Sequence, residues 1–424
     1  MSRTLLTGNA AAAWGARLAG VDYVPAFPIT PQTEIIETFA RWIEDGEMDA
    51  KMVTMDSEHS MLTAAGAAAA TGVRVFTATS SQGLLYAMEM LYSVAGWRAP
   101  FVLVNVSRAL AAPVTLEPDH NDVLAARDSG ALQIHCATCQ EVLDGVLFAH
   151  RLAEDRRVRL PVIVNLDGFF LSFTREPVEI PSREAARAFA GDFDPGPVRF
   201  RASKPVSQAV AVLGGGPYSY FRYEMHAAAK AAYSVYQELA DEFEDTFGRR
   251  HAAVETYRSD DAEVTFFAVG SFATKARDAV DRLREAGLAV GLVRPRLLRP
   301  FPTDALRRAL AGIRGVAVLD QNLSMGMGGV LHSELAAALY NDHEVRPTLV
   351  SFIGGLGGRD IAPEEFFEMA EVTRVAALSG RVPEPRLLYT RSELREIRKL
   401  QAIAVAERND IASQRRSSTG EESP

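Results

Sequence analysis

The chain has 424 residues, which is enough for two or three domains with hydrophobic cores. A net charge of −9 argues against a nucleic-acid-binding surface, and no apolar run reaches the roughly 18 residues of a membrane span. Two cysteines, Cys136 and Cys139, exclude a disulfide framework, and no signal-peptide core is seen. We therefore expect a cytoplasmic protein with small-molecule or protein partners.

Residues 1–180 alternate between helix-like and strand-like segments. Their patterns predict helices at 8–20, 60–70, 82–97 and 142–153, and strands at 21–28, 73–79, 100–108 and 160–167. Repeated strand–helix–strand units predict a parallel sheet covered by helices on both faces. This part of the chain is therefore predicted to be a doubly wound α/β domain.

The pattern changes after residue 180. Residues 181–260 are interrupted by Gly, Pro and charged residues, and they read as a connecting segment with one long helix at 225–245. Alternation resumes over 261–380, with a strand predicted at 289–298, and indicates a second, smaller doubly wound α/β domain. The charged tail, 381–424, is predicted to be partly disordered.

Four polar segments stand at the carboxyl ends of predicted strands or open the next helix. They are FPITPQT (27–33), DSEHS (56–60), TATSSQGL (77–84) and SRA (107–109). Each alone has an ordinary explanation as a rigid loop, a helix cap or an ion pair. Ligands of doubly wound folds bind at this edge of the sheet, and an arginine such as Arg108 suits a carboxylate there.

Taken together, these segments are recognisable as a family pattern. FPITPQT, SEHS, FTATSSQGL and VNVSRA, with VGLVRPRLLRPFP and LDQN further along, resemble the alpha subunit of thiamine-diphosphate-dependent 2-oxoacid:ferredoxin oxidoreductases, of the pyruvate:ferredoxin oxidoreductase type. The resemblance runs from about Gly8 to Arg381. It implies a pyrimidine-binding domain for thiamine diphosphate, followed by a transketolase C-terminal-like domain.

The resemblance also implies roles for individual residues. The catalytic glutamate of the family matches Glu58, which would hydrogen-bond the aminopyrimidine ring and support its activating tautomer. The residues that contact substrate match Thr30 and Arg108. Further cofactor contacts are expected at Pro28, Ile29, Ser81, Gln82 and Gly83. No metal ligand is expected from this chain.

Two missing motifs imply partner subunits. The family's relatives hold diphosphate and Mg²⁺ with a Gly-Asp-Gly motif, which this chain lacks, so a beta subunit is expected to supply that half of the site. An iron–sulfur cluster of this type needs four cysteine ligands, and the chain has two cysteines. The clusters are therefore expected on partners, among them the ferredoxin-like gamma and delta subunits.

The implied reaction is oxidative decarboxylation of a 2-oxoacid with coenzyme A. Pyruvate is the first expectation, while phenylglyoxylate, 2-oxoglutarate and branched-chain oxoacids stay open. The alternative from another class is a non-redox, transketolase-like transferase.

Three further features have more than one interpretation. Cys136 and Cys139 are read as two ordinary thiols, although a redox pair or half of a metal site is open. The segment 119–122 (DHND) is read as a polar loop, with the substrate entrance and a partner contact as alternatives. A solvated or inter-subunit basic edge is expected at Arg294, Arg296 and Arg299, the alternative being contact with an anionic partner such as coenzyme A.

Overall fold

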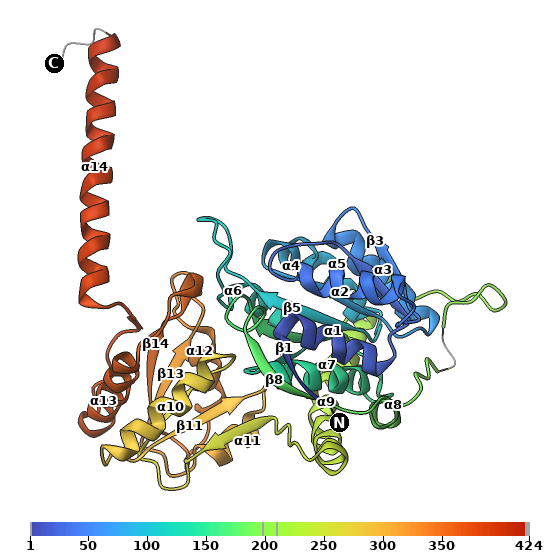
Figure 1. The fold of residues 1–424 in the computed structure, drawn as a ribbon. Helices are drawn as coiled ribbons and strands as arrows, with labels where there is room; N and C mark the ends of the chain where they lie inside the picture. The colour runs from blue at the N-terminus through green and yellow to red at the C-terminus, as the bar shows by residue number, and fades with distance from the viewer. Residues whose placement is uncertain (1, 197–198, 209–210, 420–424) are drawn as a thin grey trace. The chain divides into compact units, whose positions relative to one another are not determined.

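The computed structural model describes residues 2–196, 199–208 and 211–419, and its ribbon is drawn in Figure 1. The chain forms two compact units, 1–385 and 386–424. The second unit contains the short strand β15 (Arg386–Leu387) and the helix α14 (Arg391–Thr419). The predicted disorder at the end of the tail falls partly on residues 420–424, which lie outside the described residues.

The first unit contains two main sheets, and the first has the strand order β12-β6-β7-β5-β4. Four strands run parallel: β4 (Phe76–Thr79), β5 (Val102–Ser107), β6 (Leu132–His135) and β7 (Val162–Asp167). β12 (Leu297–Arg299) adds to β6 in the antiparallel sense. Every residue of the four parallel strands is buried, as expected of a sheet covered on both faces.

Helices cover both faces of this sheet. One hydrophobic core lies under α1 (Gly8–Ala19), α2 (Thr33–Glu44), α7 (Cys139–Glu154), α8 (Arg183–Ala190) and α9 (Gly215–Phe247). A second core lies under α3 (Glu58–Thr71), α4 (Gln82–Tyr86), α5 (Met88–Gly96) and α6 (Asn121–Ala125). The alanine-rich α1 packs closely on α7, because a Cβ on Gly15 would stand 2.6 Å from the Leu143 carbonyl oxygen.

Two strand pairs flank the first sheet. β2 (Tyr23–Ala26) pairs in parallel with β3 (Lys51–Thr54). β1 (Ser2–Thr7) pairs antiparallel with β8 (Arg175–Ile180).

The second sheet has β13 (Gly315–Asp320) and β10 (Val264–Phe267) at its centre. β14 (Thr348–Ile353) and β11 (Val290–Pro295) extend it in parallel, and β9 (Val254–Tyr257) joins β11 antiparallel. Its helices are α10 (Phe272–Glu285), α11 (Thr303–Ala309), α12 (Val330–Leu339) and α13 (Pro363–Ser379), with 3₁₀ turns at Ala126–Asp128 and Leu356–Gly358 elsewhere in the unit. The predicted α/β class with two such sheets is confirmed, whereas the exact domain limits stay a prediction.

Several elements differ from their predicted form. The predicted helix at 82–97 is two helices, α4 and α5, which meet at Ala87. The long helix α9 begins ten residues earlier than predicted, at Gly215 rather than at 225. The predicted strand at 289–298 divides, and its second part, β12, completes the first sheet rather than the second. β9 lies inside the segment predicted as a connection and belongs to the second sheet.

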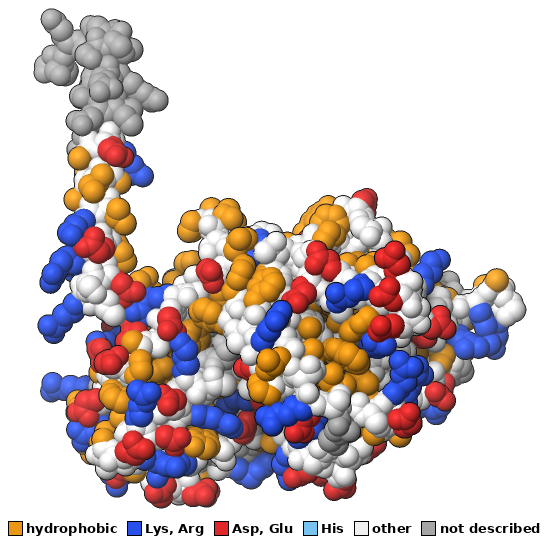
Figure 2. Space-filling view, viewed as in Figure 1, with side chains coloured by type: hydrophobic (Ala, Val, Ile, Leu, Met, Phe, Trp, Pro, Cys, Tyr) orange, Lys and Arg blue, Asp and Glu red, His pale blue; other side chains and the backbone are white. Residues whose placement is uncertain are grey.

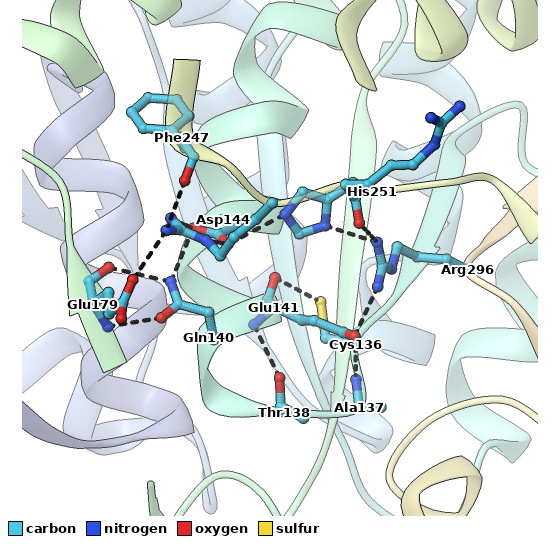
Figure 3. A network of polar contacts seen from close by, with 12 residues as sticks. Cys136, Ala137, Thr138, Gln140, Glu141, Asp144, Glu179, Phe247, His251 and Arg296 are labelled. Carbon is cyan, nitrogen blue, oxygen red and sulfur yellow. Dashed lines mark hydrogen bonds and ion pairs between the residues drawn. The ribbon is translucent and has the colours of Figure 1, made fainter. Parts of the chain in front are cut away.

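A buried polar network at the start of α7 joins the domain of the first sheet to the domain of the second sheet (Figure 3). Arg294 and Arg296 both donate to the Glu141 carboxylate. Arg294 Nη1 lies 2.8 Å from Glu141 Oε1, and Arg296 Nη2 lies 2.7 Å from the same oxygen. Their side chains are only 3% and 7% exposed. Burial alone would raise the pKa of Glu141, but the two guanidinium groups hold it well below its ordinary value.

The expectation of a basic edge at these arginines is therefore wrong. Arg294 and Arg296 lie between the domains, where buried cations need carboxylate partners. Arg299 is also paired, with both guanidinium nitrogens on Glu334. None of the three presents a free charge to an anionic partner.

Within the described part of the chain, no helix is long and apolar enough to cross a bilayer.

Candidate active site

Glu58 is the first residue of α3 and follows the N-cap residue Ser57, whose hydroxyl accepts a hydrogen bond from Ser60 N at 3.2 Å. The Glu58 residue is only 6% exposed, and among the described residues its carboxylate has no hydrogen-bond partner. The helix N-terminus favours a negative charge at this position. A buried carboxylate still requires a polar partner. The position of Glu58 therefore suits a carboxylate whose hydrogen-bond partner is a bound ligand.

Gly83, in the first turn of α4, lies directly against Glu58. A Cβ on Gly83 would stand 2.5 Å from Glu58 Oε1 and 2.6 Å from Thr79 Oγ1. The Thr79 hydroxyl is itself buried and has no hydrogen-bond partner among the residues that the structure describes. The absence of a side chain at residue 83 thus allows the Glu58 carboxylate and the Thr79 hydroxyl to lie against the start of α4.

Arg108 follows the carboxyl end of β5 and reaches two of the other predicted segments. Its Nη1 donates to the Thr30 carbonyl at 2.7 Å, and its Nη2 donates to Gln82 Oε1 at 2.7 Å. Burial lowers the pKa of Arg108, and the nearby Asp122 charge opposes that shift. Its Nε is buried without a partner, so one donor of the guanidinium remains unused.

Ser81 forms the sharp turn between β4 and α4. It adopts φ 51° and ψ −122°, a conformation that residues with a side chain rarely occupy. Two bonds fix it: its N–H donates to Asp122 Oδ2 at 3.0 Å, and its Oγ lies 2.8 Å from the Ala109 carbonyl. This turn aims the first residues of α4 at the carboxyl edge of the sheet.

The structure thus brings most of the predicted site residues together. Arg108 joins the Thr30 loop to Gln82, and Gly83 joins that helix start to Glu58. The other two predicted contacts, Pro28 and Ile29, precede Thr30 on the same loop, with Pro28 exposed and Ile29 half-buried. Their roles as cofactor contacts stay predictions, as do those of the other predicted residues.

The segment 119–122 is not the polar loop that was favoured from the sequence, because Asp119, His120 and Asp122 are all buried. His120 Nε2 lies 2.6 Å from Asp167 Oδ1, and Ser271 N donates to Asp167 Oδ2 at 2.7 Å. Asp167 ends β7 of the first sheet, whereas Ser271 precedes α10 of the second domain. The segment therefore lies between the carboxyl edges of the two sheets.

Sequence reasoning missed two contributors to this site, Thr79 and Asp122. Thr79 had a visible signal, because it is a hydroxyl residue at the end of a buried strand. Asp122 lay within the segment 119–122, but nothing in the sequence connected it with Ser81 or Arg108.

The two cysteines are free, buried thiols. Cys136 Sγ contacts the Glu141 carbonyl at 3.3 Å, and Cys139 Sγ contacts the Thr174 carbonyl at 3.4 Å. Burial raises the pKa of both thiols, which keeps them protonated. This environment fits ordinary thiols rather than a reactive pair.

The fold and its matching family model identify an α/β protein of the thiamine-diphosphate-binding class. Residues 14–244 match the family model for pyruvate flavodoxin/ferredoxin oxidoreductase, thiamine diphosphate-binding, and residues 262–366 match the model for pyruvate:ferredoxin oxidoreductase core domain II. The chain belongs to the pyruvate:ferredoxin oxidoreductase family.

Individual relatives agree with that membership. The pyruvate synthase subunit PorA of Pyrococcus abyssi is 39% identical over 90% of this chain and 96% of that relative. The ketoisovalerate oxidoreductase subunit VorA of Pyrococcus horikoshii is also 39% identical, over 90% of this chain and 96% of its own length.

A solved structure supports the fold. It is the 2-oxoglutarate:ferredoxin oxidoreductase from Magnetococcus marinus, with 2-oxoglutarate, coenzyme A and succinyl-CoA bound. It shares 19% identity at a TM-score of 0.67, over 87% of this chain. This chain spans 65% of the length of that larger polypeptide.

Proposed function

We propose that this chain is the alpha subunit of a multi-subunit 2-oxoacid:ferredoxin oxidoreductase with pyruvate as its substrate. In the proposed reaction pyruvate and coenzyme A give acetyl-CoA, carbon dioxide, one proton and two electrons. The carbon–carbon bond to the carboxylate breaks, the acyl carbon forms a bond to sulfur, and the electrons leave through iron–sulfur clusters to ferredoxin.

The observation that carries this proposal is the unpartnered Glu58 carboxylate beside Gly83 and Thr79. A buried acid without a hydrogen-bond partner suits the ring nitrogen of an aminopyrimidine, because that contact replaces the hydration that Glu58 has lost. Bound thiamine diphosphate supplies a nucleophilic carbon and an electron sink for decarboxylation of a 2-oxoacid. In the proposal Glu58 holds the proton-sharing contact to the ring, while Thr79 supplies an additional polar contact nearby.

Arg108 is the proposed binding group for the substrate carboxylate. It stands at the carboxyl edge of the sheet, and its guanidinium is held by neutral acceptors rather than by an acid. A substrate carboxylate therefore offers it a stronger, charge-assisted bond than it has now. Thr30, whose carbonyl already contacts Arg108, is proposed to contact the substrate through its exposed hydroxyl.

We also propose that partner subunits complete the site. The chain has neither a Gly-Asp-Gly motif nor four cysteines, so a beta subunit is proposed for diphosphate and Mg²⁺, and cluster-bearing partners, gamma and delta, for electron transfer. Apolar side chains exposed near the site support a covering partner: Tyr86 on α4, and Val114 and Leu116 in the loop after β5, whose hydrophobic tip is visible in Figure 2. A cytoplasmic location, where thiols stay reduced, is part of the same proposal.

Substrate choice is the part of the proposal that most needs an experiment, because a ketoisovalerate relative at 39% identity is nearly as similar to this chain as pyruvate synthase relatives at 39% and 42%. The complex would be purified through a tag on this chain. Reduction of a viologen dye would then be measured with pyruvate, 2-oxoglutarate, 2-oxoisovalerate and phenylglyoxylate, each with and without coenzyme A.

We expect coenzyme-A-dependent reduction with pyruvate at a kcat/KM at least about tenfold above the other acids, a ratio that corresponds to roughly 1.4 kcal/mol of transition-state binding. Preference for another acid would replace pyruvate and keep the chemistry. Thiamine diphosphate in the complex without dye reduction by any acid would contradict the redox proposal and favour a transferase.

A further inference from the structure

We propose that Asp122 is a positioning residue for substrate binding: its buried carboxylate fixes Arg108 and the Ser81 turn, and thereby sets the affinity for the 2-oxoacid. This inference rests on the proposed function, in which Arg108 binds the substrate carboxylate. It assigns a role to the one acid of the segment 119–122 that faces the site.

Asp122 is completely buried, and five donors converge on its carboxylate. Oδ2 accepts from Ser81 N at 3.0 Å, Asn105 Nδ2 at 3.1 Å and Arg108 N at 3.1 Å. Oδ1 accepts from Ser107 Oγ at 2.6 Å and from Val123 N at 2.7 Å. All five donors are neutral backbone N–H, amide or hydroxyl groups.

Three of these donors come from the segments that form the site. Ser107 ends β5 and Arg108 follows it, and Ser81 connects β4 with α4. These segments also meet directly, since Ser81 Oγ donates to the Ala109 carbonyl at 2.8 Å, but without an acceptor at Asp122 the buried N–H groups of Ser81 and Arg108 would be left unsatisfied. The carboxylate therefore adds a shared acceptor that fixes the backbone at Ser81 and at Arg108.

The Ser81 turn depends on this acceptor most directly. Its positive φ is a costly backbone conformation for a residue with a side chain, and such conformations persist only where surrounding bonds hold them. Ser81 N–H has Asp122 as its acceptor, and Gln82, the next residue, accepts from Arg108 Nη2. A change at Asp122 therefore affects Arg108 in two ways. It removes the acceptor of the Arg108 backbone N–H, and it releases Ser81, whose neighbour Gln82 accepts from the Arg108 guanidinium.

Asp119 provides a matched control within the same segment. It is also buried, at 4% exposure, and its carboxylate accepts from Asn121 N at 3.0 Å and Gly357 N at 3.4 Å. It therefore contacts the second domain but no residue of the proposed substrate site. Substitutions at Asp119 and Asp122 remove the same chemical group from equally buried positions.

The test compares Asp122→Ala, Asp122→Asn, Asp119→Ala and Asp119→Asn in the purified complex, with Arg108→Ala alongside. Steady-state dye reduction gives KM for pyruvate, KM for coenzyme A and kcat. Hydrogen exchange followed by mass spectrometry gives the protection of the amides of Ser81 and Arg108.

For Asp122→Ala we expect KM for pyruvate to rise roughly tenfold, with kcat and the KM for coenzyme A within about threefold of wild type. Asp122→Asn should raise KM less, because one amide oxygen can still accept from Ser81, Asn105 and Arg108. Both variants should exchange the two amides faster than wild type, and both Asp119 variants should resemble wild type. If Asp122→Ala fails to fold, Asp122→Asn decides through the same two measurements.

The inference is overturned if the Asp122 variants match the Asp119 variants in KM, or if the amides of Ser81 and Arg108 keep their protection. Failure of the proposed function looks different, since Arg108→Ala would then leave KM for pyruvate unchanged or wild type would show no oxoacid-dependent reduction. A KM that rises in Arg108→Ala but in neither Asp122 variant counts against Asp122 alone.

Discussion

At the scale of single residues, the site depends on a glycine as much as on charged groups. Gly83 lets the buried Glu58 carboxylate and Thr79 hydroxyl both lie against the start of α4, and neither polar group has a hydrogen-bond partner among the described residues. Any side chain at residue 83 would collide with both groups. The contact with Glu58 is therefore sensitive to a change of one methyl group.

Gly83→Ala tests this reading. Alanine favours a helix, so the fold should tolerate the substitution, but the added methyl must displace Glu58 or the ligand. We expect the affinity of the complex for thiamine diphosphate to fall about tenfold, which corresponds to ~1.4 kcal/mol of the overpacking cost. Titration of cofactor-depleted complex with thiamine diphosphate, followed by calorimetry, measures the loss.

Gly96→Ala is the control, because a Cβ at Gly96 would meet no atom within 4 Å. It lies at the end of α5 and adds the same methyl group to a helix. Equal cofactor affinity in the two variants would contradict the proposed place of the ring beside Glu58.

The residues of the site could be predicted only in part from the sequence. Glu58, Thr30 and Arg108 followed from a resemblance, each in a segment whose local pattern alone fitted a cap, a loop or an ion pair. Asp122 could not be identified, since its donors at 81, 105, 107 and 108 come together only when strands β4 and β5 pair. Its burial has no local signature, because a polar run such as DHND is usually solvated.

At the scale of elements, long apolar runs predicted the central strands well, and tertiary contacts decided the rest. α2 was missed although Ile35, Ile36, Phe39 and Trp42 follow a helical period and are buried. The strand predicted at 289–298 divides because Arg296 turns toward Glu141 of the other domain, which sends β12 to the first sheet. No periodicity within that stretch specifies which sheet it joins.

At the scale of the whole molecule, the buried pairs of Glu141 hold the two domains of the first unit together. The folded-state pKa of Glu141 is depressed below its ordinary value of 4.5 by Arg296 and Arg294, against the effect of burial. The stabilisation is therefore fully present above about pH 4.5 and is lost as the pH falls further, toward the folded-state pKa. Acid should weaken the junction between the domains.

Glu141→Gln tests this account of the junction. Removing one partner leaves two buried guanidinium groups without their carboxylate, so the free energy of unfolding at pH 7 should fall by about 3 to 5 kcal/mol. The variant should also lose less stability than wild type as the pH falls below about 4.5. Denaturant unfolding at several pH values, followed by circular dichroism, measures both effects.

Glu238→Gln serves as the comparison, because Glu238 pairs with Arg157 at 2.7 Å on the surface, where both side chains are more than half exposed. Its midpoint should not change measurably. A loss in Glu238→Gln as large as in Glu141→Gln would contradict a special role for the buried network.

The measurement that tests the central claim most directly is dye reduction by the assembled complex carrying Glu58→Gln, with Glu365→Gln as its partner experiment. Glu365 is a similarly buried glutamate, 7% exposed, in the first turn of α13, and it pairs with Arg359 in the second domain. We predict that Glu58→Gln lowers kcat at least 100-fold, or about 2.7 kcal/mol, while the complex stays assembled and Glu365→Gln remains active. Full activity of Glu58→Gln would remove this glutamate from the mechanism and contradict the account.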